Sequence, residues 1–254
     1  MLRLLLVITL LLSVSNANLK INNKQLSVLQ KVYNIGKKYK TKDGLSFEKT
    51  LSSIYLAESN AGMSIIGDNY TQTGKVKSIY ESSLGAGQIQ LRTAQKVLNT
   101  FPKLKEKYKY LIHNHIASYI KYVKILKNIN NFQNILKNPK WKNKKTKKAK
   151  NILKWAKFEL NKNKKIIKEK YWNDIIKDNK LINKLLIDVK FSATISVHYL
   201  IMNYQRAQRL KISNPYFSTI SLYNGGFVNH KYYNKIMRKM RIVKKLIKNN
   251  RIKN

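Results

Sequence analysis

Apolar residues at steps of three and four positions dominate this 254-residue chain from residue 104 onwards. One stripe runs from Leu104 to Val123, a shorter one from Ile175 to Leu186, and a third from Ala193 to Tyr204. This spacing puts apolar side chains on one face of an α-helix, and no long alternating strand pattern accompanies it. Only 9 Gly and 3 Pro interrupt the chain. We therefore predict a mainly α fold of one domain, with or without a helical appendage.

Lysine dominates the charge. The chain has 52 Lys and Arg against 11 Asp and Glu, a formal net charge of +41, and only seven of the cations are Arg, so 52 − 7 = 45 are Lys. Such a charge suggests a polyanionic partner, which would be nucleic acid, an anionic membrane or an acidic cell-wall polymer. Lys acts as a hydrated point charge and lacks the bidentate fork of Arg. A coding bias towards Lys, Asn and Ile is an equally good explanation.

The N-terminus has the layout of a secretory signal peptide, predicted over residues 1–17. Arg3 precedes an apolar stretch from Leu4 to Leu12, and Ser15-Asn16-Ala17 offers a cleavage site. The stretch is far shorter than a membrane-spanning helix, although an uncleaved anchor is the alternative. The chain has no Cys, so disulfides and lipoprotein acylation are excluded. We expect a periplasmic protein, or a secreted one, with no specific nucleic-acid partner and no membrane span after cleavage.

Charge also divides the mature chain, residues 18–254. Residues 43–99 hold five acidic and five basic residues and are neutral, whereas residues 130–187 read as a Lys-rich helical insertion and residues 235–254 as a basic C-terminal helix. Between residues 138 and 170 of the insertion, three large aromatic residues are interleaved with Lys and Asn: Trp141, Trp155 and Phe158. Core packing is favoured for them over a docking role towards an envelope machine.

Glu58 is the first candidate for chemistry. Ser46 can cap a helix that Gly62 ends, and Glu58 shares an inward face with three apolar residues, Leu51, Ile54 and Tyr55. Desolvation and the negative end of the helix are both expected to raise the pKa of the Glu58 carboxyl. A carboxylic acid kept neutral near pH 7 can act as the general acid in glycosidic cleavage. The alternative is a surface Glu at a frayed helix end.

Two Gly-containing segments follow. Residues 81–90 include Gly85-Ala86-Gly87, which alone predicts only a turn and lacks the Lys-Ser/Thr ending of a phosphate loop. Tyr223-Asn224-Gly225-Gly226 also reads as a tight turn. The four His lack metal-ligand spacing, so neither a metal site nor a cofactor is predicted.

Together, three motifs resemble those of the soluble-lytic-transglycosylase (SLT) family of lysozyme-like enzymes. They are Glu58-Ser59-Asn60, then the segment from Ser83 to Ala94, then Tyr223-Asn224-Gly225-Gly226, and they cover roughly residues 45–100 and 188–240. The resemblance implies an all-α, lysozyme-like SLT domain carrying the Lys-rich insertion. It implies that Glu58 is the single acid/base, with substrate-binding residues Ser83, Gln88, Tyr223, Asn224 and Tyr232.

The chain departs from the family in three ways. The Gly-rich motif is compressed, so Gln90 competes with Gln88 for the family Gln, and Ser221-Leu222 replaces the usual small residue before Tyr223. The insertion also widens the gap between the second and third motifs. These departures affect substrate subsites more than the reaction.

The family mechanism needs no second carboxylate. One Glu protonates the glycosidic oxygen between N-acetylmuramic acid and N-acetylglucosamine, the N-acetyl group assists, and the 6-hydroxyl closes a 1,6-anhydro ring. Glu81 and Asp68 are therefore dispensable, although either could position water in a hydrolytic enzyme like goose-type lysozyme. The remaining alternative is a non-enzymatic basic protein that binds the envelope or nucleic acid.

Overall fold

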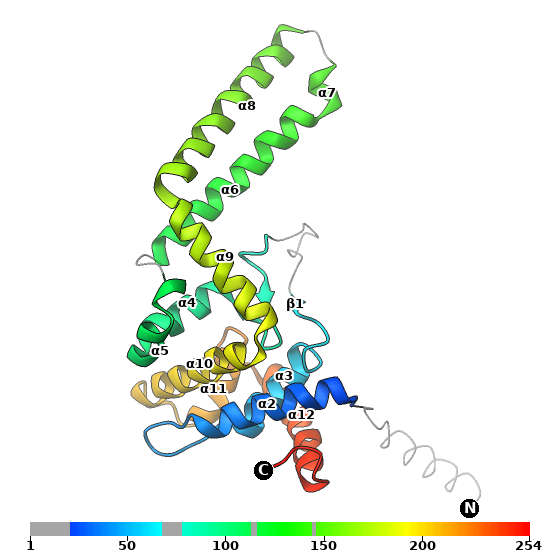
Figure 1. Cartoon of the computed structure of the whole chain (residues 1–254), viewed down its shortest axis with the longest axis vertical. Helices are drawn as coiled ribbons and strands as arrows, with labels where there is room; N and C mark the ends of the chain where they lie inside the picture. The colour runs from blue at the N-terminus through cyan, green and yellow to red at the C-terminus, as the bar shows by residue number, and fades with distance from the viewer. Residues whose placement is uncertain (1–20, 68–77, 113–115, 144–145) are drawn as a thin grey trace, which may run out of the picture.

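The computed structural model describes residues 21–67, 78–112, 116–143 and 146–254, and the predicted signal peptide, residues 1–17, lies outside them. The predicted mainly α fold is confirmed (Figure 1). The α-helices are α2 (Asn23–Lys38), α3 (Glu48–Glu58), α4 (Leu91–Thr100), α5 (Pro102–Lys107), α6 (Ile116–Lys137), α7 (Pro139–Lys142), α8 (Lys147–Ile166), α9 (Trp172–Ile187), α10 (Val189–Arg209), α11 (Pro215–Tyr223) and α12 (His230–Lys248). A 3₁₀ turn, η1 (Lys109–Leu111), follows α5, and a π-helical turn, η2 (Ile167–Tyr171), joins α8 to α9.

Helix α10 lies between two apolar cores. Its residues Val197 and Leu200 join a cluster with α2, α3 and α12, while Phe191 and Ile195 join a second cluster with α4 and α9. Asp188 caps the helix by accepting a hydrogen bond from the Phe191 N–H at 2.9 Å. A helix buried on several sides fixes the relative positions of both cores, and therefore of the segments that join them.

A small antiparallel sheet of order β1-β2-β3 lies beside these cores. Its strands are β1 (Ile66–Gly67), β2 (Ser83–Leu84) and β3 (Ile89–Gln90), and Leu84 pairs with both Ile66 and Ile89. Leu84 and Ile89 are buried in the second core. The Gly-rich segment is thus the connection between two paired strands, which anchor it on both sides.

The prediction of one helix along the stripe from Leu104 to Val123 is wrong. Helix α5 ends at Lys107 and α6 begins at Ile116. Leu104 and Leu111 are buried in the second core, whereas Tyr122 and Val123 belong to a third cluster with Ile167. The apolar spacing continues in the sequence, but its two halves serve different cores, so the chain turns between them.

Helices α6, α7 and α8 with η2, residues 116–171, form a projecting structure that we call the hairpin (Figure 1). The predicted insertion boundary at 130 falls inside α6, and α9 returns to the body, where Leu181 and Leu185 are buried. At the base, the buried Asp178 accepts hydrogen bonds from Gln95 of α4, at 2.9 Å, and from Tyr122 of α6.

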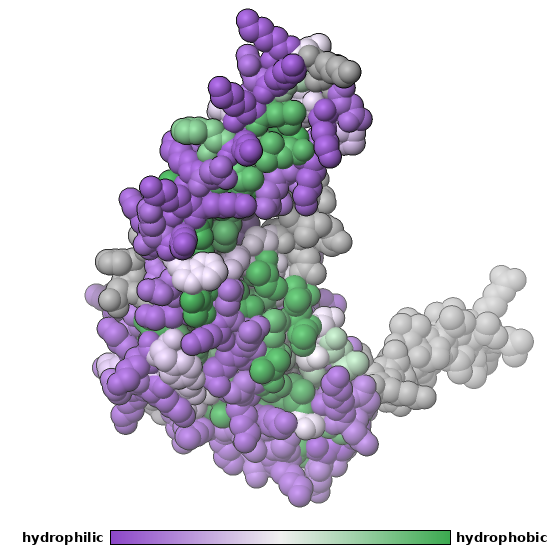
Figure 2. Space-filling model, turned by 45° about the horizontal axis from the view of Figure 1, so that its top comes forward, coloured by the Kyte–Doolittle hydropathy of each residue, from purple (hydrophilic) through white to green (hydrophobic). Residues whose placement is uncertain are grey.

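Core packing, the interpretation favoured for the insertion aromatics, is wrong for two of them. Trp155 is 52% exposed and Phe158 is 64% exposed. Figure 2 shows apolar surface along the hairpin between hydrophilic edges. Within the described ranges no single helix is long and apolar enough to cross a membrane; one strongly bent pair, Lys147–Ile187 with Val189–Arg209, passes by length and composition alone.

Helix α12 begins at His230, earlier than the predicted 235. The Asn229 side chain caps it, accepting a hydrogen bond from the Tyr232 N–H at 2.9 Å. Local capping outweighs the charge pattern in deciding where this helix starts. The earlier start places Tyr232 and Lys235 in the first turns of α12, next to the end of α3.

Candidate functional site

Glu58 is the last residue of α3. The predicted cap at Ser46 is wrong, because the helix begins at Glu48 and its N-cap position is Phe47, which forms no side-chain cap and is fully buried. Core packing of the Phe47 ring therefore sets the start of the helix. The Glu58 side chain is 17% exposed, and its buried Oε1 forms no hydrogen bond with any described residue.

Ser59 ties the end of α3 to the Gly-rich segment. Its hydroxyl is buried, donates to the Ala86 carbonyl oxygen at 2.6 Å and accepts from the Gly62 N–H at 2.8 Å. Gly62 has φ +83°, a left-handed conformation that suits glycine. The Glu-Ser pair thus combines a carboxylate that faces the site with a hydroxyl that holds the opposite wall in place.

The Gly-rich segment needs its glycine at position 85. Gly85 has φ +70°, and a Cβ there would overlap the Leu185 carbonyl oxygen of α9. Three residues on, Gln88 donates from Nε2 to the carbonyl oxygens of Gly85, at 3.0 Å, and Ser64, at 3.2 Å. These bonds hold the Gln88 side chain in one orientation beside β1, where it forms part of the cleft wall.

Tyr223 connects the third motif to the second. Its hydroxyl donates a hydrogen bond to the Gly87 carbonyl oxygen at 2.8 Å. The same hydroxyl lies 3.1 Å from Ser196 Oγ, also within hydrogen-bond distance. Burial raises the pKa of the Tyr223 hydroxyl well above its usual value, so the group stays a neutral donor. Asn224 ends α11, and its Oδ1 accepts from Asn229 Nδ2 at 3.3 Å.

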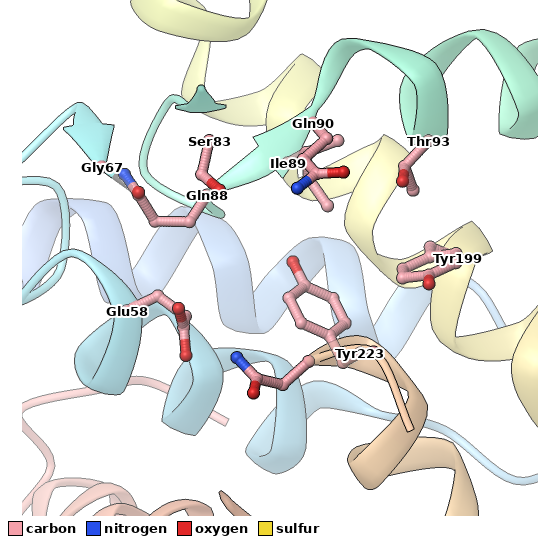
Figure 3. Close-up of a pocket in the computed structure, with 11 residues that line it drawn as sticks. Glu58, Gly67, Ser83, Gln88, Ile89, Gln90, Thr93, Tyr199 and Tyr223 are labelled. Atoms are coloured by element: carbon pink, nitrogen blue, oxygen red, sulfur yellow. The ribbon is translucent and has the colours of Figure 1, made fainter. Parts of the chain in front are cut away.

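These segments enclose a cleft of about 500 Å³. Figure 3 shows Glu58 and Tyr223 on one side, facing Ser83, Gln88 and Gln90 on the other. Five of the predicted site residues line it, namely Glu58, Ser83, Gln88, Tyr223 and Asn224, together with Gly67, Ile89, Gln90, Thr93, Tyr199 and Gly225. Neither Lys nor Arg occurs among these described lining residues.

Tyr232 and Lys235 approach Glu58 from α12, outside the cleft lining. Burial and then the Glu58 charge raise the pKa of the Tyr232 hydroxyl. Lys235 Nζ lies 3.6 Å from Glu58 Oε1. Sequence reasoning missed Lys235. Its only distinguishing signal is its position one turn after Tyr232, since nothing else separates it from the 44 other Lys.

Glu81 is not among the residues that line the cleft. Its carboxylate pairs with Lys127 Nζ of α6 at 2.7 Å, which links the sheet region to the hairpin. Asp68 falls outside the described residues. Glu58 is therefore the only acidic residue that the described part of the chain contributes to the cleft lining.

Among the described residues, no group of three or more His, Asp or Glu side chains comes together in a way that could hold a metal ion. His198 serves a packing role instead. Its Nδ1 lies 2.7 Å from the Thr194 carbonyl oxygen, and its ring contacts those of Tyr39 and Phe101. Burial lowers the pKa of His198, which favours the neutral ring.

Comparisons of the chain with protein-family models, with curated proteins and with solved structures give no match.

Proposed function

We propose that this protein is a periplasmic peptidoglycan lytic transglycosylase with a lysozyme-like, SLT-type catalytic domain. The observation that carries the proposal is the Glu58 carboxylate, which has one buried oxygen without a hydrogen bond and lies in a cleft lined by all three predicted motifs. Apart from the Lys235 ammonium, 3.6 Å from Glu58 Oε1, the described polar groups around this carboxylate are uncharged hydroxyls and amides, which suits proton transfer to a neutral sugar polymer.

In the proposed reaction, Glu58 donates its proton to the glycosidic oxygen as the bond from C1 of the muramyl sugar breaks. The neighbouring N-acetyl group stabilises the cationic C1, so no second carboxylate is required. Glu58, now a carboxylate, removes the proton of the 6-hydroxyl, whose oxygen bonds to C1. The products are a 1,6-anhydromuramic acid end and a free 4-hydroxyl, and Glu58 regains its proton.

The lining of the cleft also supports a saccharide. Ser83, Gln90 and Asn224 offer hydroxyl and amide groups that both donate and accept hydrogen bonds, as sugar hydroxyls require. Tyr199, which is partly buried in the lining, supplies apolar surface for the face of a sugar ring. A phosphate or nucleic-acid substrate would favour Lys or Arg in the lining.

Mass spectrometry of digested sacculi tests the proposal. Wild-type protein should release 1,6-anhydro ends, whereas Glu58→Gln should reduce the rate at least about a thousandfold without changing the melting temperature, since no proton can be donated. Glu81→Gln is the matched control and should stay active, because Glu81 pairs with Lys127 and is not among the residues that line the cleft.

Each other outcome has a definite meaning. Full activity of Glu58→Gln would overturn the catalytic assignment. Reducing ends in place of anhydro ends would make the enzyme a hydrolase like goose-type lysozyme, and a loss in Glu81→Gln would then identify the second carboxylate. Intact glycan strands with tight nucleic-acid binding at physiological salt would establish the non-enzymatic alternative.

A further inference from the structure

The hairpin leaves much of its apolar surface uncovered. Two helices packed only against each other leave part of their apolar faces in solvent, because no further layer covers them. Accordingly, from Ile125 onwards no apolar residue of α6 is fully buried. On α8, Trp155 packs one edge against Phe132 of α6, with ring centroids 5.3 Å apart. The rest of the Trp155 ring is exposed, as is Phe158 one turn later.

The same surface is strongly basic. Residues 116–171 contain 18 Lys, 2 Glu and no Arg, Asp or His, a net charge of 18 − 2 = +16. A second copy of the hairpin would be repelled by this charge, so self-association does not cover the apolar surface. Charge complementarity requires an anionic partner.

The side chains narrow the class of that partner. The α8 face brings Lys147, Lys148, Ile152 and Trp155 together around one shallow depression of about 500 Å³. Duplex nucleic acid and acidic wall polymers offer negative charge but no apolar layer for Phe158 and Ile152. An anionic lipid surface offers both, with phosphate groups for ammonium ions and an acyl boundary for Trp and Phe rings.

We propose that the α8 face carrying Trp155 and Phe158 docks on an anionic phospholipid surface. The flanking Lys side chains would reach the lipid phosphates while the two rings enter the interface, without spanning the bilayer. The inference does not depend on the proposed enzymatic function. The hairpin projects from the body (Figure 1), so its α8 face is free to meet a surface larger than the protein.

Vesicle binding by the full chain tests this proposal. All three Trp of the chain, Trp141, Trp155 and Trp172, lie in or directly after the hairpin, so Trp emission reports on this region alone. Phosphatidylglycerol vesicles should shift the emission to the blue and sediment with the protein, in a salt-sensitive manner, and phosphatidylcholine vesicles should not.

Two double variants separate the rings from general apolar surface. Trp155→Ala with Phe158→Ala should weaken binding to phosphatidylglycerol vesicles at least about tenfold, because the variant lacks the two rings whose burial in the lipid interface stabilises the complex. Ile187→Ala with Leu210→Ala removes exposed apolar residues outside the hairpin, 81% and 57% exposed, and should bind like wild type. All four side chains are exposed, so both variants should keep the wild-type circular dichroism.

Three results would overturn the proposal. The first is equal binding to both vesicle types, and the second is undiminished vesicle binding by the Trp155/Phe158 variant. The third is hairpin-dependent binding to sacculi, nucleic acid or a protein, combined with no binding to vesicles. Cleavage of soluble glycan strands by this variant should be unchanged. Loss of vesicle binding alone would therefore leave the enzymatic proposal standing, and loss of activity in Glu58→Gln would leave the docking proposal standing.

Discussion

Ser59→Ala is the sharpest test of how the cleft is held together. Ser59 is 1% exposed, and its hydroxyl connects the end of α3 to the opposite wall by donating to the Ala86 carbonyl oxygen, while it accepts a hydrogen bond from the Gly62 N–H. The substitution removes one oxygen atom and keeps the rest of the side chain. It therefore isolates the hydrogen bonds from the packing.

The expected loss follows from the groups left unpaired. A buried polar group deprived of its partner destabilises the fold by about 1–3 kcal/mol. Ala86 is buried and Gly62 is only partly buried, so water can replace the bond to Gly62 but not the bond to Ala86. We expect a loss of about 2–3 kcal/mol, which lowers the melting temperature of a domain of this size by about 4–12 °C.

Ser52→Ala is the matched control. Ser52 is fully buried in the same helix, but its hydroxyl donates at 2.8 Å to the Glu48 carbonyl oxygen, which the helix ladder already uses. This variant should lose less than about 1 kcal/mol. Thermal unfolding by circular dichroism gives both values, and sacculus digestion should show about tenfold lower kcat/KM for Ser59→Ala alone. Equal melting temperatures and equal activities in the two variants would refute the bridging role.

Two further predictions concern the cores around the cleft. Gly85→Ala should lower the melting temperature by several degrees, because an alanine at φ +70° is strained and its Cβ would overlap the Leu185 carbonyl oxygen; a stability equal to wild type would contradict the close approach. His198 has a pKa lowered by burial, so below its unfolded value of about 6.5 the unfolded chain binds the extra proton and the fold loses stability as the pH falls. His198→Phe should therefore show a smaller decrease in melting temperature between pH 7.5 and 5.5 than wild type, and an unchanged decrease would show that other groups control acid stability.

Local rules explain why parts of the site could be predicted. The three-residue and four-residue spacing of apolar residues predicted that Glu58 faces inward. In the structure Glu58 lies at the end of α3 and its side chain is largely buried. The glycine at position 85 indicated a turn, which the structure contains at φ +70°. The turn after Tyr223 likewise follows directly from Asn and Gly residues. Each of these features depends on neighbours in the sequence.

Features that depend on distant neighbours could not be predicted. Phe47 occupies the N-cap position of α3 because the core buries its ring, although Ser46 is the better cap by residue type. The stripe from Leu104 to Val123 divides because two cores compete for it. Lys235 pairs with Glu58 only because α12 crosses the end of α3. Periodicity predicts which face of a helix is apolar, but it does not predict which other segment of the chain packs against that face.

The distribution of charge separates two kinds of surface in one chain. Lys and Arg account for 52 of 254 residues, yet none is among the described residues that line the cleft. The hairpin instead has a net charge of +16 from 18 Lys and 2 Glu. Lys235 approaches Glu58 from outside that lining, with its Nζ 3.6 Å from Oε1. The proposed neutral sugar would therefore meet hydroxyl and amide groups along most of the cleft. Under the two proposals, recognition of an anionic surface and chemistry on a neutral sugar strand would make opposite demands on charge. The chain would meet these demands separately, with 18 Lys on the projecting hairpin and Glu58 as the one carboxylate among the described residues that line the cleft.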